Sequence, residues 1–485
     1  MSISGSLFNA YSGLKSAART AEAISNNVAN AMTIGYGRRE VELSAASING
    51  RGAGVQVAGV LRLVDQVAIS DRLLAESALG GNRVRADAFA RLESAIGTPG
   101  DGSSLSDRVT EFEAALLDAE GRPDAEVRLR NVLFAAKDLI ATVGGISDET
   151  QEMRMSADAG IGRQVGILNE TLSRIETLNH DIRLHVGGGG DVNGLLDQRQ
   201  QLVDKLAEIV PIKTYQRDHG QIAIVSIGGV SLLDGSAAEF GFSPTGLITP
   251  EMDLASGALS ALQVNGKDIS IGTGSGGLEG GSLSALFQVR DVIAPKASAQ
   301  IDAFARNLME RFEAGGLDST LNAGDAGLFT DGGGKLDTAL ETGLAGRLAL
   351  NVAVDPDQGG VSWRLRDGLG ALVPGDVGDN SLLLAFSDAL TNGRAPLSGS
   401  FSPHALSLAG LSGDLTALNS TERLHADEAE AFATSRYQAL LSTELDAGVD
   451  TDQEMQKLLL VEQAYAANAR VVSTVDEMLR AILEM

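Results

Sequence analysis

Cysteine is absent from all 485 residues of the chain. A disulfide framework, a thiolate nucleophile and a cysteine-ligated metal are therefore excluded. The chain also has no apolar run of about 20 residues, so no membrane insertion is predicted. Its first residues carry neither a basic segment nor a compact apolar one. No cleavable secretory signal is expected.

Basic residues are few, and the formal net charge is -26. Without a basic stripe to displace phosphate counterions, nucleic acid is not an expected partner. Aromatic residues make up only 4% of the chain, whereas glycine contributes 58 residues. This composition favours long helices joined to small β modules with glycine turns. The length allows three or four domains.

The two ends of the chain share one apolar period, with steps that alternate between three and four residues. Such a period is typical of a coiled-coil seam. At the N-terminal end it comprises Ile3, Leu7, Ala10, Leu14, Ala17, Ala21, Ile24 and Val28. At the C-terminal end it comprises Leu458, Val461, Tyr465, Asn468, Val472, Val475, Leu479 and Ile482.

Both ends are expected to be helices, and Thr451 with Glu454 predicts a capping box at the start of the second. Residues 1–40 carry four basic and two acidic side chains, and residues 450–485 carry three basic and seven acidic ones. Opposite charge and the unfilled seams favour pairing of the two helices. Two unrelated amphipathic helices on a globular core remain the alternative.

The rest of the chain predicts an α+β, elongated, multi-domain protein. Helices are expected at about 66–96, 104–119, 123–143, 148–186, 192–209, 284–313 (bent or interrupted at Pro295) and 404–446, forming an antiparallel rod. The domain prediction is 1–65 with 447–485 as an inner unit, 66–210 with 282–314 and 404–446 as the rod, and two inserted mainly-β modules at 211–281 and 315–403.

No catalytic, cofactor-binding or metal-binding residues are predicted. The segment from Gly272 to Gly277 matches a dinucleotide-binding pattern, but it follows predicted hairpins and favours a flexible link. The five histidines form no metal-binding motif. The pair Asp355 and Asp357 lacks the remaining ligands of a calcium loop.

Two stretches resemble the axial proteins of the bacterial flagellum. Residues 25–38 read SNNVANAMTIGYGR, similar to the N-terminal signature of rod, hook and hook-associated proteins. Residues 454–479 are similar to their C-terminal helix. Within the first stretch, a shaped turn is the interpretation for Asn26, Asn27, Asn30, Gly35 and Tyr36, with an ordinary helix stop as the alternative. For Asn26 alone the helix stop is favoured.

Two further stretches narrow the resemblance to the hook-associated protein 1 family. Residues 195–210 read LLDQRQQLVDKLAEIV, and residues 281–291 read GSLSALFQVRD. Gly37 departs from the family, which usually has a small hydroxyl residue there. Residues 330–400 match no part of the family pattern.

The resemblance implies a structural, non-enzymatic protein that forms a ring between hook and filament. Implied partners are further copies of the chain, hook protein, a second junction protein next to the filament, and an export chaperone with the export apparatus. The implied location is the flagellum, reached through the flagellar export channel. A hook or distal rod protein is the alternative, and an enzyme carried on a flagellar scaffold is a further one.

The resemblance places the assembly interface on the two terminal helices and the turn after the first. The predicted interface residues are Ile3, Leu7, Leu14, Ile24, Asn27, Val28, Asn30, Gly35, Tyr36, Leu458, Val461, Tyr465, Asn468, Val472, Val475, Leu479 and Ile482. For Asn468, a polar seam position that fixes register and a tolerated exposed residue are both open.

Overall fold

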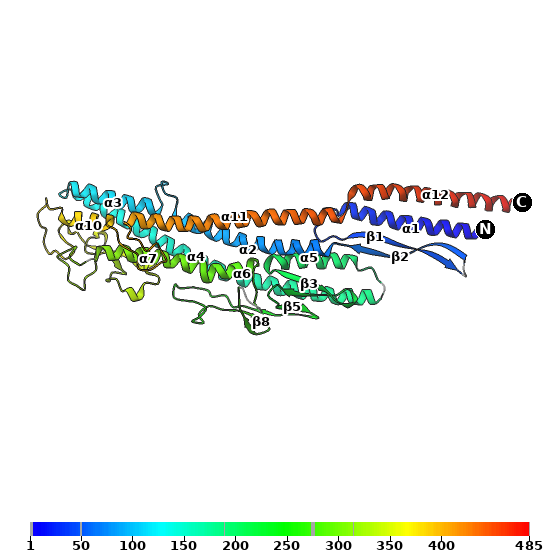
Figure 1. Cartoon of the computed structure of the whole chain (residues 1–485), viewed down its shortest axis with the longest axis horizontal. Coiled ribbons are helices and arrows are strands. Elements are labelled where there is room, and N and C mark those ends of the chain that lie inside the picture. The colour runs from blue at the N-terminus through cyan, green and yellow to red at the C-terminus, as the bar shows by residue number, and fades with distance from the viewer. Residues whose placement is uncertain (1–2, 49–50, 189, 273–276, 314, 485) are drawn as a thin grey trace.

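The computed structural model describes residues 3–48, 51–188, 190–272, 277–313 and 315–484. Within them the protein is a long, narrow α+β molecule (Figure 1). Helices run along its length, and small antiparallel sheets lie on its side. Both chain ends lie at one tip of the molecule, as the N and C labels show (Figure 1).

Long helices form the rod. They are α2 (Gln66–Ile96), α3 (Leu105–Gly121), α4 (Glu126–Gly187), α5 (Asn193–Ile209), α6 (Gly281–Gln288), α7 (Ala294–Phe312) and α11 (Leu408–Gly448). Two large buried cores hold them together. One lies among α3, α4, α7 and the segments inserted after α7, and the other joins α2, α4 and α5 to the sheets after α5.

The helix α4 corrects the sequence prediction, which placed a break between residues 143 and 148. Gly144 and Gly145 lie inside one continuous helix. Glycine costs only about 1 kcal/mol in a helix interior. Val143 and Ile146 on either side are fully buried in the first core, and their burial outweighs that cost.

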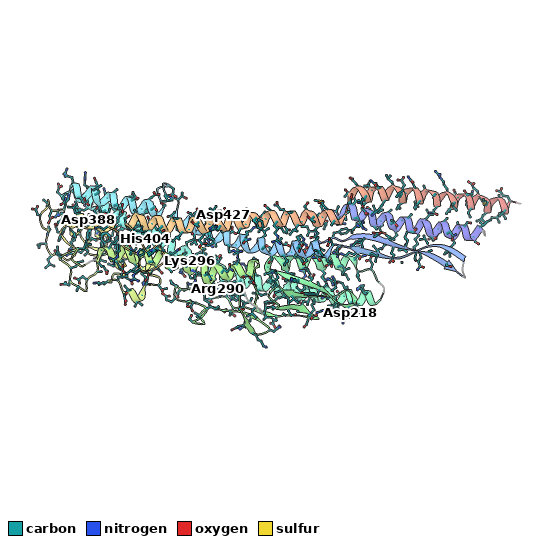
Figure 2. All side chains as sticks on the ribbon, viewed as in Figure 1. Asp218, Arg290, Lys296, Asp388, His404 and Asp427 are labelled. Atoms are coloured by element: carbon teal, nitrogen blue, oxygen red, sulfur yellow. The ribbon has the colours of Figure 1, made fainter. Side chains whose placement is uncertain are left out.

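The helix expected to bend at Pro295 is instead widened. A π-helical segment, Val289–Ile293, joins α6 to α7. Proline has no backbone N–H, and a wider turn accommodates that gap without ending the helix. The π segment carries Arg290, which lies near the middle of the molecule (Figure 2). Arg290 pairs with Asp158 of α4 at 2.8 Å, and both side chains are completely buried.

The segment after α5 holds small antiparallel sheets. Its first sheet has the order β3-β4-β5-β6 and its second the order β7-β8-β9, all antiparallel. The strands are β3 (Ile212–Gln216), β4 (Ile222–Ser226), β5 (Ser231–Asp234), β6 (Ser236–Ala237), β7 (Phe240–Gly241), β8 (Leu262–Val264) and β9 (Lys267–Ile269). The Gly272–Gly277 pattern lies mostly outside the described residues.

The second insert was wrongly predicted to be mainly β. Its described strands are β10 (Phe329–Asp331) and β11 (Leu348–Leu350), accompanied by α8 (Leu344–Arg347), α9 (Arg364–Asp367) and α10 (Ser381–Thr391). Four phenylalanines, Phe112, Phe312, Phe329 and Phe386, make ring contacts between 5.0 and 6.1 Å at its base. These long-range contacts order short turns whose glycines suggested hairpins, a tertiary effect that local pattern does not carry.

Candidate assembly surface of the terminal helices

The terminal helices, α1 (Ile3–Ala29) and α12 (Thr451–Leu483), lie side by side and extend beyond the rod (Figure 1). A two-stranded arm, β1 (Arg38–Ile48) and β2 (Arg51–Leu63), runs along α1. The helices touch closely at Gly13, where an added Cβ would lie 2.6 Å from Nδ2 of Asn468. Asn468 also donates to the carbonyl of Ala464 in its own helix, at 2.9 Å.

Only part of each predicted seam is covered within one chain. The covered or half-covered members are Ile3, Ala10, Leu14, Ala17, Ala21, Ile24, Leu458, Val461, Asn468, Val472 and Val475. The exposed members are Leu7, Val28, Tyr465, Leu479 and Ile482. The pairing of the helices thus leaves predicted interface residues open to solvent.

The sequence prediction missed a second apolar stripe on α12. Leu460, Ala464, Ala467, Val471 and Met478 are all exposed. Their spacing of four, three, four and seven residues repeats the period of the seam, so the signal was present in the sequence. Phe8 and Tyr11 of α1 are also exposed. Contiguous exposed apolar side chains of this kind mark association surfaces.

Asn27 is the buried centre of the joint between the terminal helices and the arm. Its Nδ2 donates to the carboxylate of Glu454 and to the Arg39 carbonyl, both at 2.9 Å. Its Oδ1 accepts from the hydroxyl of Tyr36 at 2.9 Å and from the backbone N–H of Arg39 at 2.8 Å. The side chain is completely buried, and its hydrogen-bonding groups are all used.

The other predicted turn residues have separate roles. Asn30 donates to the carbonyl of Asn26 at 2.9 Å, in the manner of a helix stop. Gly35 has a φ of 83°, which glycine adopts without strain. Burial raises the pKa of the Tyr36 hydroxyl, while the nearby Arg39 opposes that rise. The hydroxyl therefore stays protonated and donates to Asn27.

Asp197 of α5 ties this joint to the rod. Its carboxylate accepts from Arg39 and Arg62, each at 2.8 Å, and from the backbone N–H of Gly37 at 3.1 Å. Arg62 also donates to the carbonyl of Gly35 at 3.0 Å. An added Cβ on Gly37 would lie 2.4 Å from Cγ of Arg62. The departure from the family pattern at Gly37 therefore makes room for Arg62.

The expected capping box at the start of α12 is wrong. Asp450 is the N-cap, and its side chain accepts from the backbone N–H groups of Asp452 and Gln453. Glu454 is instead buried against Asn27, with Lys457 bound at 2.9 Å. A partner 427 positions away in the sequence competes successfully for this carboxylate. Glu454 is thus an interface residue that the capping interpretation concealed.

A buried charge cluster lies where the rod meets this joint. Arg72 of α2 is completely buried and contacts Glu76 at 2.8 Å, Asp204 of α5 at 2.7 Å and Glu444 of α11 at 2.5 Å. Burial raises the pKa of Glu76 to about 7, against the opposing effect of Arg72. Burial also raises the pKa of Glu444. Three carboxylates around one guanidinium leave this cluster short of positive charge.

The described residues contain no group of three or more side chains suited to hold a metal ion. Among the helices in the described ranges, none combines the length and apolar character needed to cross a membrane.

Comparison with known proteins shows which protein families this chain resembles. The family model for the flagellar hook-associated protein FlgK helical domain matches residues 89–328. The model for the flagellar basal body rod FlgEFG protein C-terminal region matches residues 446–485. The second match covers α12.

Full-length relatives agree with the family models. Flagellar hook-associated protein 1 of Bacillus subtilis is 24% identical over 98% of this chain and 98% of its own. The protein of the same name from Escherichia coli is 25% identical over 98% of this chain and 99% of its own. A solved structure, the flagellar hook junction protein FlgK from Burkholderia pseudomallei, is 20% identical over 54% of this chain and 46% of its own, with a TM-score of 0.43. That likeness is too weak to bear on the assignment.

The paired terminal helices on a helical rod, together with these matches, define a structural axial component of the bacterial flagellum. The names of its relatives associate them with the flagellar hook. Within this class, the chain belongs to the flagellar hook-associated protein 1 family.

Proposed function

We propose that this chain forms a ring at the junction between hook and filament, through its paired terminal helices. The observation that carries the proposal is the apolar surface of α1 and α12 that one chain leaves uncovered, above all Leu460, Val471 and Met478. Burial of apolar surface contributes roughly 25 cal/mol per Å². Neighbouring copies would supply the missing cover.

In this proposal, α1 and α12 act as a short coiled coil, with Asn468 against Gly13 setting the register. Those predicted interface residues that are exposed or half-covered in one chain then contact adjoining copies and the hook protein below. For the four predicted domains, the proposal is that the inner unit lines the tube of the flagellum. The rod and the two inserts then lie outside that tube. The role is structural and requires no catalytic group.

The proposed partners are further copies of the chain, hook protein and a second junction protein next to the filament. An export chaperone and the export apparatus would carry the chain through the flagellar channel before assembly. The absence of cysteine suits that route, since no disulfide has to form or break.

A substitution on the exposed stripe tests the proposal without removing a buried contact. L460D is expected to leave the purified chain folded and to abolish its addition to hooks. Q456D, one turn earlier at an exposed polar position, is the matched control. Electron microscopy of flagella from cells that express each variant is the measurement. Normal filaments with L460D would contradict the proposal.

Truncation gives an independent test. A chain that ends at residue 454 is expected to keep the two rod cores and to lose assembly. Limited proteolysis of the free full-length chain is expected to remove both ends and leave a core from about 65 to 445. A hook or distal rod protein would instead form long polymers by itself, which microscopy of the purified chain would reveal.

A further inference from the structure

The tip of the molecule opposite to the chain ends carries both a projection and a recess. The projection is formed by Leu372 and Val373, with 88% and 73% of their surfaces exposed. Leu372 is the most exposed large hydrophobic residue in the described part of the chain. The recess is a groove of about 680 Å³ between the start of α4 and the segment around α9.

The loop that carries the projection is held in place. The backbone N–H groups of Leu369 and Gly370 donate to the side chains of Asp318 and Thr320, at 2.7 and 3.0 Å. Arg364 donates to the Ala371 carbonyl at 3.1 Å, just before the projection. After it, the N–H of Gly375 donates to Asp367 at 3.0 Å. A loop fixed on both sides presents its apolar pair with little entropy left to lose on binding.

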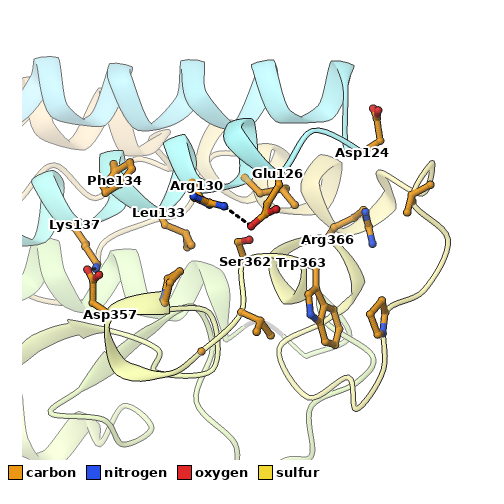
Figure 3. Close-up of a pocket in the computed structure, with 16 residues that line it drawn as sticks. Asp124, Glu126, Arg130, Leu133, Phe134, Lys137, Asp357, Ser362, Trp363 and Arg366 are labelled. Carbon is orange, nitrogen blue, oxygen red and sulfur yellow. Dashed lines mark hydrogen bonds and ion pairs between the residues drawn. The ribbon is translucent and has the colours of Figure 1, made fainter.

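The lining of the groove combines apolar side chains with charged ones. Leu133, Phe134, Val361 and Trp363 are among its lining residues (Figure 3). Phe134 is 58% exposed, although it is a large aromatic side chain. Aromatic side chains of this kind supply much of the binding energy of protein interfaces.

The cations that line the groove are already paired inside the chain. Arg130 contacts Glu126 at 2.6 Å, as the dashed line shows (Figure 3). Lys137 binds Asp355 and Asp357, and Arg366 binds Asp367. A groove with internally neutralised charge favours an apolar occupant over an anionic one.

Pro374 and Val377 of the same loop line the groove, whereas Leu372 and Val373 do not. The projection of one chain therefore does not fill its own groove, and both of its side chains stay exposed. Two different surfaces that are not in contact within one copy can meet between two copies as a head-to-tail contact. Such contacts form a ring when the rotation between copies closes.

We propose that Leu372 and Val373 of one copy dock into the groove at Phe134, Val361 and Trp363 of the next copy around the ring. This inference rests on the proposed junction ring. Rotation about the ring axis keeps every point at the same height and radius, and projection and groove lie at the same tip. The contact would link the outer ends of neighbouring subunits, far from the terminal helices.

The absence of native cysteine allows a direct test in the full-length chain. F134C and L372C are made as separate variants and co-expressed, so that a disulfide can form only between copies. Assembled flagella are oxidised, and the chain is examined for dimers on non-reducing gels. F134C with L247C is the matched control, because Leu247 is an exposed apolar residue of the first insert.

A disulfide-linked dimer as the main species for F134C with L372C, and only traces for the control, is the expected result. Rings that form without this dimer would overturn the docking contact and leave the junction function standing. A parent chain that forms no ring would overturn both. The variant L372D/V373D, altered only at exposed positions, is expected to fold and to give rings that dissociate more readily.

Discussion

The side-chain amide of Asn27 donates to the carboxylate of Glu454 at 2.9 Å, across 427 positions of sequence. Asn27 lies in the last turn of α1, and Glu454 lies in the first turn of α12. Because both are buried, the bond joins the two ends of the chain where water does not compete. The same amide holds Tyr36 and Arg39 of the following turn. The joint therefore forms only when both ends are in place.

Replacing Asn27 should loosen this joint. N27A removes the partner of Glu454, of the Tyr36 hydroxyl and of both backbone polar groups of Arg39. An unpaired buried polar group costs about 1–3 kcal/mol, so local unfolding of the joint should become easier by about 3 kcal/mol. Hydrogen exchange at Arg39 measures the change. N26A is the control, since Asn26 is exposed, and equal effects of the two variants would contradict the assignment.

Gly37 and Arg62 should behave as a coupled pair. G37A puts a methyl group against Arg62, which cannot move away without leaving Asp197 and the Gly35 carbonyl. G37A alone should destabilise the joint, and R62A should relieve much of that effect. A double-mutant cycle by urea unfolding should give a coupling energy of about 1–2 kcal/mol. Additive effects would show that the two residues do not compete for space.

The Arg72 cluster predicts a pH effect on stability. Folding raises the pKa of Glu76 to about 7 from its ordinary value of 4.5, so between these pH values the folded chain binds more protons than the unfolded chain. The resulting stability is fully present below about pH 4.5 and is lost as the pH rises through about 7. E76Q keeps an acceptor for Arg72 and removes the titration. It should exceed the parent in unfolding free energy at pH 8 by up to roughly 3 kcal/mol.

The measurement is urea unfolding of E76Q and the parent at pH 5.5 and pH 8. Other charged or titratable groups around Glu76 are Arg72, Asp204, Glu208 and Glu444. E149Q, which alters a half-exposed pair with Arg91, is the control. A parent that gains stability from pH 5.5 to 8 relative to E76Q would refute the role assigned to Glu76.

The sequence pattern was sufficient to predict the long helices of the rod and the two terminal helices. Helix bounds such as Gln66–Ile96 follow from apolar period and from the glycine after the helix, both local properties. The continuous helix through Gly144 and Gly145 was missed because a local rule counts glycine as a breaker. The burial of Val143 and Ile146, which decides the outcome, depends on distant partners.

In the candidate site too, contacts between residues far apart in the sequence could not be predicted from local pattern. Asn27 was predicted as a turn residue, but its bond to Glu454 was not, nor were the pairs that Asp197 makes with Arg39 and Arg62. Glu454 satisfied a local capping pattern, and Asp197 lay in a family stretch without an assigned partner. Ion pairs over separations of 135 and 158 positions leave no trace in helical period.

The start of α12 has two interpretations, which a mutation can separate. In one, Asp450 caps the helix, and in the other, Thr451 and Glu454 form a capping box. Asp450 caps the helix by accepting from two backbone N–H groups, whereas the Thr451 side chain has no capping role. D450A should therefore cost about 1 kcal/mol of helix stability and speed hydrogen exchange at Asp452 and Gln453. T451A should leave both rates nearly unchanged. The reverse order would restore Thr451 as the cap and release Glu454 for its expected capping role, which the bond to Asn27 opposes.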